Sequence, residues 1–134
     1  MKIKKRHIWT VLLLIYIAAV AYLCFMKPEG LPKVSPEFLG IPVDKVVHFL
    51  MFFPFTPMAY FSFKPKSRNM LPHFLVLLAV YAVGLSLAIG TEHVQGQLGY
   101  RSEDIHDFYA DLVGISCSTA GTVIHILLNK NRDE

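Results

Sequence analysis

Ionisable side chains gather in two short stretches of this sequence, on either side of a long apolar region. Carboxylates, a histidine and two cations at such spacing could bind a polar ligand, move a proton between neighbouring groups, or lock helices together through ion pairs. The candidate functional residues are Asp44, Lys45, His48, Glu92, Gln95, Arg101, Asp107 and Asp111. Ionisable groups beside long apolar runs are costly unless they pair or face water, so we predict that these residues form one polar site.

Helical spacing places several of these residues on shared faces. Asp44 and His48 are four residues apart, and Glu92 and Gln95 are three apart, so each pair shares one face of a helix. A longer series follows at intervals of 4, 3, 4, 3 and 4: Asp107, Asp111, Gly114, Ser118, Gly121 and His125. This series is a single helical stripe, and its small residues are typical of helix contacts in membranes. We expect the stripe to face the bundle, with its carboxylates toward Glu92, His48 and Arg101.

The residue types would allow a metal site, but their spacing does not favour one. His48, Glu92, His93 and Asp107 are the candidate ligands, because Zn²⁺ accepts imidazole and carboxylate groups. No tight ligand motif such as H-E-x-x-H occurs in the sequence. We therefore predict no metal centre, and the sequence points to no particular cofactor. No serine stands in a recognised nucleophile turn, so acid–base chemistry by paired carboxylates is the enzymatic option.

The elements that must position this site are apolar runs of membrane length. The sequence is 54% hydrophobic and its mean hydropathy is +0.45, well above that of ordinary soluble proteins. About 20 apolar residues in a helix cross the hydrocarbon core of a bilayer. We predict one all-α membrane domain over residues 1–134, a bundle of four transmembrane helices. The predicted spans cover residues 8–26, 45–63, 71–90 and 104–128.

Several local features qualify this prediction. The first run could be a signal peptide with Ala19-Val20-Ala21 as its cleavage box, but the run continues past the box, which favours an uncleaved span. Pro54 and Pro57 predict that the second span is kinked or, alternatively, re-entrant. Residues 27–43 are rich in proline and glycine, which predicts a loop. The two cysteines lie inside apolar runs, which predicts buried side chains rather than a disulfide.

Basic residues mark one side of the predicted bundle. Nine of the thirteen lysines and arginines precede the first span, join the second to the third, or follow the fourth. Eight of the ten acidic residues belong to the opposite side. By the positive-inside bias, both termini are then cytoplasmic and the polar site lies at the outer face. The basic residues are few and flank apolar spans, so we expect anionic lipid rather than nucleic acid as their partner.

Two motifs in this sequence resemble signatures of the VanZ-like membrane proteins. The first signature, D-K-x-x-H-F, is present as Asp44-Lys45-Val46-Val47-His48-Phe49. The second matches at Glu92, Gln95, Arg101, Asp107 and Gly114. Asp111 stands where the family usually has asparagine, and Val94 stands where a histidine often precedes the glutamine. The resemblance covers roughly residues 40–120 and implies a multi-pass plasma-membrane protein of bacteria. It also implies signature residues near the extracytoplasmic face, in a family named for resistance to the glycopeptide teicoplanin.

Three functions stay open on the sequence. The first is binding of a cell-envelope lipid headgroup, a cell-wall precursor or a glycopeptide-related ligand, with Lys45 and Arg101 on a phosphate. The second is a membrane enzyme acting on a lipid-linked or phosphate-bearing envelope precursor, with Glu92 or Asp107 as base and His48 as proton carrier or ligand. The third is a scaffold whose charges only lock helices. The lipid bilayer is the expected partner in each, an oligomer is compatible with each, and whether the chain is catalytic is left open.

Overall fold

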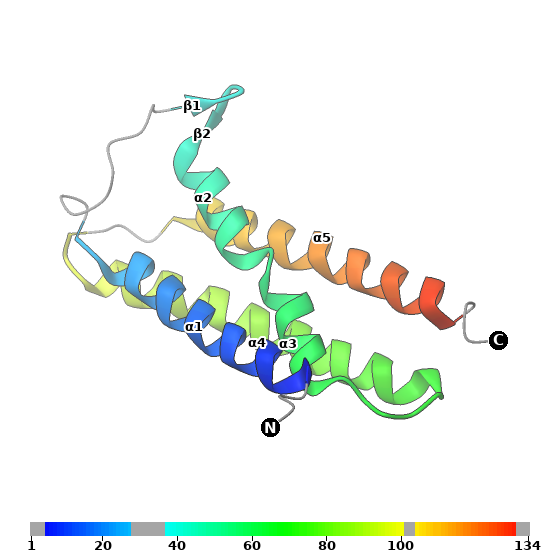
Figure 1. Cartoon of the computed structure of the whole chain (residues 1–134). Coiled ribbons are helices and arrows are strands. Elements are labelled where there is room, and N and C mark those ends of the chain that lie inside the picture. The colour runs from blue at the N-terminus through cyan, green and yellow to red at the C-terminus, as the bar shows by residue number, and fades with distance from the viewer. Residues whose placement is uncertain (1–4, 28–36, 101–103, 131–134) are drawn as a thin grey trace.

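Helices dominate the computed structural model, which describes residues 5–27, 37–100 and 104–130 (Figure 1). The elements in chain order are α1 (Lys5–Phe25), β1 (Glu37–Phe38), β2 (Ile41–Pro42), α2 (Val43–Phe52), α3 (Phe55–Phe63), α4 (Met70–Gln97) and α5 (Ile105–Lys130). Four segments are long and apolar enough to cross a membrane: α1, α2 together with α3, α4, and α5. The prediction of an all-α architecture with four membrane-length spans is confirmed at this level.

Large apolar side chains cover the outside of the helices. In α1 only Leu13 and Cys24 are buried, while most of its other apolar residues face outward. Exposed apolar residues also lie along α4 and α5, including Phe74, Leu78 and Val113. A helix that is apolar all round either lies inside a large core or spans a membrane. In a chain of 134 residues, this pattern fits a bundle whose sides contact lipid.

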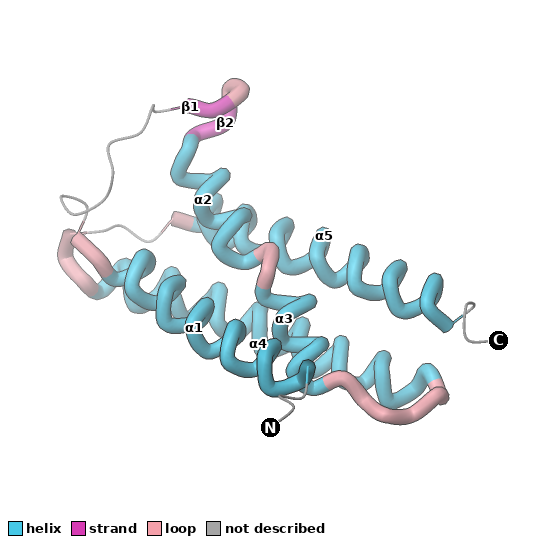
Figure 2. Tube along the Cα trace, viewed as in Figure 1, coloured by secondary structure: helices cyan, strands magenta, loops and turns pink. Residues whose placement is uncertain are grey.

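The second span is two helices that meet near Pro54 (Figure 2). Pro54 is the residue before α3 and Pro57 lies in the first turn of α3, where a missing N–H is tolerated. The Tyr16 hydroxyl of α1 donates a hydrogen bond to the Met51 carbonyl in the last turn of α2. The predicted kink is therefore present, and a neighbouring helix satisfies a carbonyl that the break leaves free.

This kinked segment runs the length of the bundle rather than turning back. At one end His48 of α2 lies beside Asp111 of α5. At the other end the Tyr60 hydroxyl of α3 is 2.6 Å from Nδ1 of His73, in the first turns of α4. The re-entrant alternative is therefore not what the structure shows.

Helix α4 continues past residue 90, where the predicted third span ends. The boundary was wrong because it followed hydropathy, whereas backbone hydrogen bonds continue through the polar residues from Thr91 onward. The helix ends at Gln97, and Gly99 then adopts a left-handed φ of 71°, as is common just beyond a helix C-terminus. The extension places Glu92 and Gln95 on helical turns, as their spacing predicted.

Part of the predicted loop is a short hairpin. Strands β1 and β2 pair antiparallel, with Glu37 opposite Pro42. The turn residues Leu39 and Gly40 have φ angles of 54° and 77°, the pattern of a type I′ turn. Sequence reasoning missed this hairpin because leucine replaces the asparagine or aspartate that usually signals such a turn. The hairpin leads directly into α2, so it precedes the helix that carries His48.

Polar residues divide between two ends of the bundle. One is the acidic end, which comprises Asp44, Lys45, His48, Glu92, Asp104, Asp107 and Asp111. The other is the basic end, which comprises Lys64, Lys66, Arg68 and Lys130. The start of α1 also lies at the basic end, because Arg6 donates a 2.7 Å hydrogen bond to the Ser62 carbonyl. The predicted grouping of basic residues on one side is therefore present among the described residues.

Candidate functional site

His48 of α2 lies at the centre of the acidic end, surrounded by three carboxylates. Its Nδ1 atom is 3.0 Å from Oδ1 of Asp111 and 3.8 Å from Oε1 of Glu92. Its Nε2 atom is 3.5 Å from Oδ2 of Asp107. His48, Glu92 and Asp111 have exposed fractions of only 2%, 4% and 0%. Three helices therefore bring one imidazole and several carboxylates together away from bulk solvent.

Lys45, one turn before His48, forms the ion pairs of this end. Its Nζ atom is 2.6 Å from Asp104, in close contact with Asp107, and 3.5 Å from Asp44. The hydrogen bond from the Lys45 ammonium holds the pKa of the Asp104 carboxyl below its usual range. The Asp104 carboxylate also accepts the backbone N–H of His106 at 2.9 Å and so caps the start of α5.

A close contact between α2 and α5 sets the position of His48. A Cβ atom on Gly114 would lie 2.6 Å from the carbonyl oxygen of Phe49, so only glycine fits without a shift of the backbone. This contact is one turn from Asp111 on α5 and one residue from His48 on α2. The lack of a Cβ at Gly114 therefore lets the two helices approach until His48 reaches Asp111.

The predicted stripe on α5 is correct for its first four residues. Asp107, Asp111, Gly114 and Ser118 are buried as expected. Gly121 and His125 are exposed instead, and the buried face continues at Thr122 and Ile126. The buried face shifts because the neighbouring helix changes along α5. The start of α5 packs on α2, whereas Ile126 near its end packs with Tyr60 of α3 and Leu77 of α4. A sequence period alone does not reveal such a change of partner.

The structure gathers six of the eight predicted site residues: Asp44, Lys45, His48, Glu92, Asp107 and Asp111. Asp44 lies on the exposed rim. Gln95 points elsewhere, because its Nε2 atom donates a 2.9 Å hydrogen bond to the Cys24 carbonyl of α1. Gln95 is therefore a buried link between α4 and α1. Arg101 lies outside the described residues.

Two other expectations are corrected. His93, a candidate metal ligand, is exposed and its Nε2 atom lies 2.9 Å from Nε2 of Gln97, away from His48. It sits one position after Glu92, so the helix turns it off the buried face. Cys24 is buried as predicted, but Cys117 is exposed on the apolar exterior of α5. Neither cysteine forms a disulfide with another described residue.

Asp104 belongs to the candidate site but is not among the site residues predicted from the sequence. Its carboxylate binds Lys45, which lies 59 positions earlier in the chain, and its backbone N–H donates to Oε2 of Glu92 at 3.3 Å. The available signal was its spacing of three residues before Asp107, which puts both carboxylates near one face at the start of α5.

A groove opens between the end of α4 and the start of α5, beside the buried cluster. Its volume is about 590 Å³, and its lining residues are Ile89, Glu92, Asp104, Ile105, His106 and Phe108. Half of these side chains are apolar and half are polar. A groove of this composition suits a ligand with an apolar part and a polar part.

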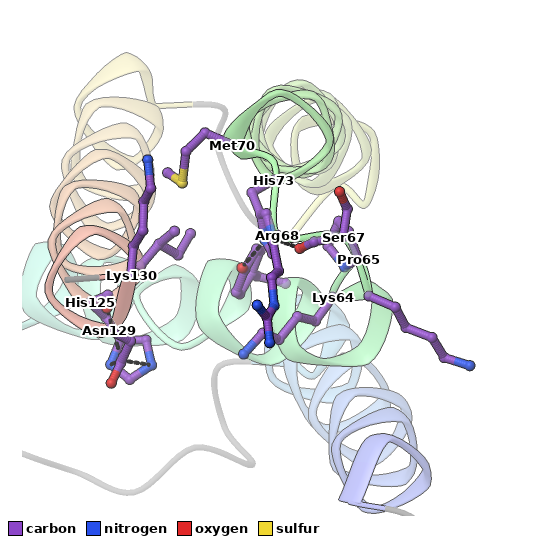
Figure 3. Close-up of a pocket in the computed structure, with 12 residues that line it drawn as sticks. Lys64, Pro65, Ser67, Arg68, Met70, His73, His125, Asn129 and Lys130 are labelled. Carbon is purple, nitrogen blue, oxygen red and sulfur yellow. Dashed lines mark hydrogen bonds between the residues drawn. The ribbon is translucent and has the colours of Figure 1, made fainter. Parts of the chain in front are cut away.

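A second hollow lies at the basic end, with a volume of about 730 Å³ (Figure 3). Figure 3 shows side chains from the 64–69 connection and from the last turns of α5 gathered around it. Its cations are Lys64, Lys66, Arg68 and Lys130. No acidic partner is recorded for any of them within the described ranges. The two ends thus differ in sign and in how their charges are paired.

The chemistry open to the acidic end is that of an imidazole between carboxylates. Such a group can carry a proton, and it can also join carboxylates as a ligand of a divalent cation. Two sets of residues place one ligand atom each within 4.8 Å of one another: His48 with Glu92 and Asp111, and His48 with Asp44 and Asp107.

Comparison with known proteins adds one relative. Over 97 residues the chain is 36% identical to an uncharacterised protein of the yeast Schizosaccharomyces pombe. The match covers 72% of this chain and 55% of that protein, so this chain spans about half the length of its relative. No protein-family model matches the chain, and no solved structure matches it. At the level of class, the fold is that of a helical protein with four helices long and apolar enough to cross a membrane.

Proposed function

We propose that this chain is a multi-pass membrane protein whose acidic end binds the headgroup of an envelope lipid. The observation that carries the proposal is the groove between α4 and α5, which joins an apolar wall to the carboxylates of Glu92 and Asp104. Ile89 and Phe108 are available to contact an acyl chain, while the polar lining contacts the headgroup. A lipid is the ligand class that combines an apolar chain with a polar headgroup.

The charges of the site limit which lipid headgroups can bind. Glu92 and Asp104 line the groove and can only accept hydrogen bonds when ionised. Lys45 lies next to Asp104 and carries a positive charge. A headgroup that offers amine or hydroxyl donors to the carboxylates, and a phosphate to Lys45, would satisfy both. Phosphatidylethanolamine has these features, whereas the quaternary amine of phosphatidylcholine has no N–H to donate.

The proposed location is the plasma or inner membrane, with the acidic end at the outer face and both termini cytoplasmic. The support is the grouping of Lys64, Lys66, Arg68 and Lys130 at the opposite end, together with the positive-inside bias. The resemblance to VanZ-like proteins supports an envelope ligand. The yeast relative supports a ligand class present in bacterial and yeast membranes alike, which favours a phospholipid over a cell-wall precursor or a glycopeptide-related ligand.

The test compares lipid binding by purified protein in detergent micelles that contain fluorescent phosphatidylethanolamine or phosphatidylcholine. We expect the wild type to prefer phosphatidylethanolamine. We expect Asp104→Asn to lower that affinity roughly tenfold or more, as loss of a hydrogen bond to a charged group typically does. Asp44→Asn is the matched control, because Asp44 also contacts Lys45 but does not line the groove. Equal affinity for both lipids, or equal losses in both variants, would overturn the proposal.

A second candidate is an enzyme acting on a lipid-linked or phosphate-bearing precursor. The observation in favour of an enzyme is that each ring nitrogen of His48 faces a carboxylate. Glu92, which also lies beside His48, lines the groove. Such an imidazole can pass a proton between Asp107 and Asp111. Turnover of a lipid-phosphate substrate that His48→Gln abolishes, with thermal stability kept, would favour the enzyme. Stability lost together with all binding would favour a scaffold whose charges only lock helices.

A further inference from the structure

The buried part of the acidic end contains two carboxylate oxygens that no described residue satisfies. Oε1 of Glu92 and Oδ2 of Asp111 are fully buried and have no hydrogen-bond partner among the described residues. The other oxygen of Glu92 accepts the Asp104 N–H, and the other oxygen of Asp111 meets His48. Buried carboxylates are normally paired, hydrogen-bonded or bound to a metal, so these two oxygens are suited to contact a positive group.

Within residues 5–27, 37–100 and 104–130, no lysine or arginine pairs with these two oxygens. Lys45 is held by Asp44, Asp104 and Asp107, one helical turn away. A protonated His48 would bring one positive charge against the two carboxylates of Glu92 and Asp111. A divalent cation bound to a neutral His48 would balance both carboxylates at once.

We propose that His48, Glu92 and Asp111 form a divalent-cation site, one ligand from each of α2, α4 and α5. Their ligand atoms lie within 4.8 Å of one another. Two ligands at about 2.1 Å from an ion, arranged tetrahedrally, are about 3.4 Å apart. The separations from His48 Nδ1 to Asp111 and to Glu92 are 3.0 Å and 3.8 Å, on either side of that value. The proposal does not depend on the identity of any lipid.

The surroundings of His48 agree with a role as a ligand. Its second nitrogen, Nε2, faces the Asp107 carboxylate at 3.5 Å. Metal-binding histidines commonly turn their other nitrogen to a carboxylate, which fixes the ring and raises its basicity. One imidazole with two carboxylates suits Zn²⁺ or Mn²⁺ better than Ca²⁺ or Mg²⁺, which favour all-oxygen sites. Asp107 is therefore the orienting carboxylate, and Lys45 holds it in turn.

This arrangement explains why the sequence, which offered His48 and Glu92 as candidate ligands, did not predict the site. The three ligands are separated by 44 and 19 positions along the chain, so no short motif joins them. Asp111 stands where the resembling family usually has asparagine, and it contributes one of the two unpartnered oxygens. The extra carboxylate is thus one of the proposed ligands in this chain.

The test is metal binding by detergent-purified protein that carries a tag without histidines. After chelator treatment, Zn²⁺ or Mn²⁺ alone is titrated by calorimetry, and the bound metal is counted by elemental analysis. We expect one ion per chain. Glu92→Gln and Asp111→Asn should each weaken binding by more than about 100-fold, and Asp107→Asn by about 10–100-fold, as outer-shell partners do. Asp44→Asn and His93→Gln are matched controls with unchanged affinity, because both residues are exposed.

Thermal unfolding in detergent gives a second measurement that is independent of calorimetry. In chelator, Asp111→Asn should unfold at the same or a higher temperature than wild type, because it removes an unbalanced buried charge. With Zn²⁺ or Mn²⁺ added, the wild type should be stabilised and the variant should not. No bound metal and no stabilisation of the wild type would overturn the site. Loss of binding in Asp44→Asn equal to that in Asp111→Asn would instead assign the ion to the rim set of Asp44, His48 and Asp107.

Discussion

At the acidic end of the bundle, His48, Glu92 and Asp111 meet from three different helices and are buried. At the basic end, Lys64, Lys66 and Arg68 follow one another along an exposed connection, and Lys130 closes the last helix nearby. Charges of the first kind need exact positions, since each must be matched by its neighbours. In a chain that crosses a membrane, charges of the second kind would need only the correct side, because anionic lipid attracts them from many geometries. Geometry would then matter at one end and charge alone at the other.

The largest effect that this comparison predicts is that the acidic and basic ends lie on opposite sides of the membrane. In a background with Cys24→Ala and Cys117→Ala, a single cysteine is placed at Glu37, before the acidic end, or at Ser67, within the basic connection. The cysteine at position 37 should react with a membrane-impermeant maleimide in intact cells. The cysteine at position 67 should react only after permeabilisation, since the positive-inside bias puts the basic end in the cytoplasm.

The control for accessibility is the same labelling in permeabilised cells, where both positions should react because both are exposed. Labelling at position 67 alone in intact cells would reverse the orientation and put the acidic end in the cytoplasm. Equal labelling of both in intact cells would mean mixed insertion.

A substitution that separates α2 from α5 should damage the acidic end and spare the basic end. In Gly114→Ala the added methyl meets the Phe49 carbonyl at 2.6 Å, and such overpacking typically costs about 1–3 kcal/mol. Thermal unfolding in detergent measures the loss. Because His48 and Asp111 flank this contact, affinity for Zn²⁺ should fall in the same variant.

Gly121→Ala on the same helix is the matched control. Nothing lies within 4 Å of a Cβ at Gly121, so alanine should be neutral or stabilise by up to about 1 kcal/mol through helix propensity. If both variants lose the same stability, the cost would reflect helix α5 in general and the close-contact argument would be wrong.

The sequence predicted the elements better than the contacts between them. Hydropathy located all four spans, since each apolar run has to satisfy its own backbone inside a membrane. Helical spacing correctly put Asp44 with His48 and Asp107 with Asp111. It could not show that Gln95 turns to the Cys24 carbonyl of α1. That contact depends on which helix packs beside α4, which spacing within one helix does not encode.

The balance of charge at the acidic end was also beyond the sequence. Asp104 caps α5 by accepting the His106 N–H. That it also binds Lys45 depends on α2 and α5 packing side by side. The unpartnered oxygens of Glu92 and Asp111 became visible only when every neighbour was placed.

The smallest change in unfolding temperature is expected at the rim of the acidic end, where the charges are exposed like those of the basic end. Asp104 is half-exposed and pairs with Lys45 at 2.6 Å, and exposed ion pairs are weakened by solvent and salt. Asp104→Asn removes the charge but keeps an N-cap side chain, because asparagine caps as well as aspartate. We expect only a slight fall in unfolding temperature, which high salt should remove.

The sign of the pH dependence follows from the direction of the pKa shift. Lys45 holds the pKa of Asp104 below its ordinary value of 3.8, so folding favours the ionised carboxylate. The stabilisation is therefore present above pH 3.8 and is lost as the pH falls through the lower pKa of the folded state. Thermal unfolding of wild type and Asp104→Asn should differ at neutral pH and converge in acid. A difference that persists in acid or in high salt would mean that Asp104 acts through packing, and that the rim belongs with the buried cluster rather than with exposed charge.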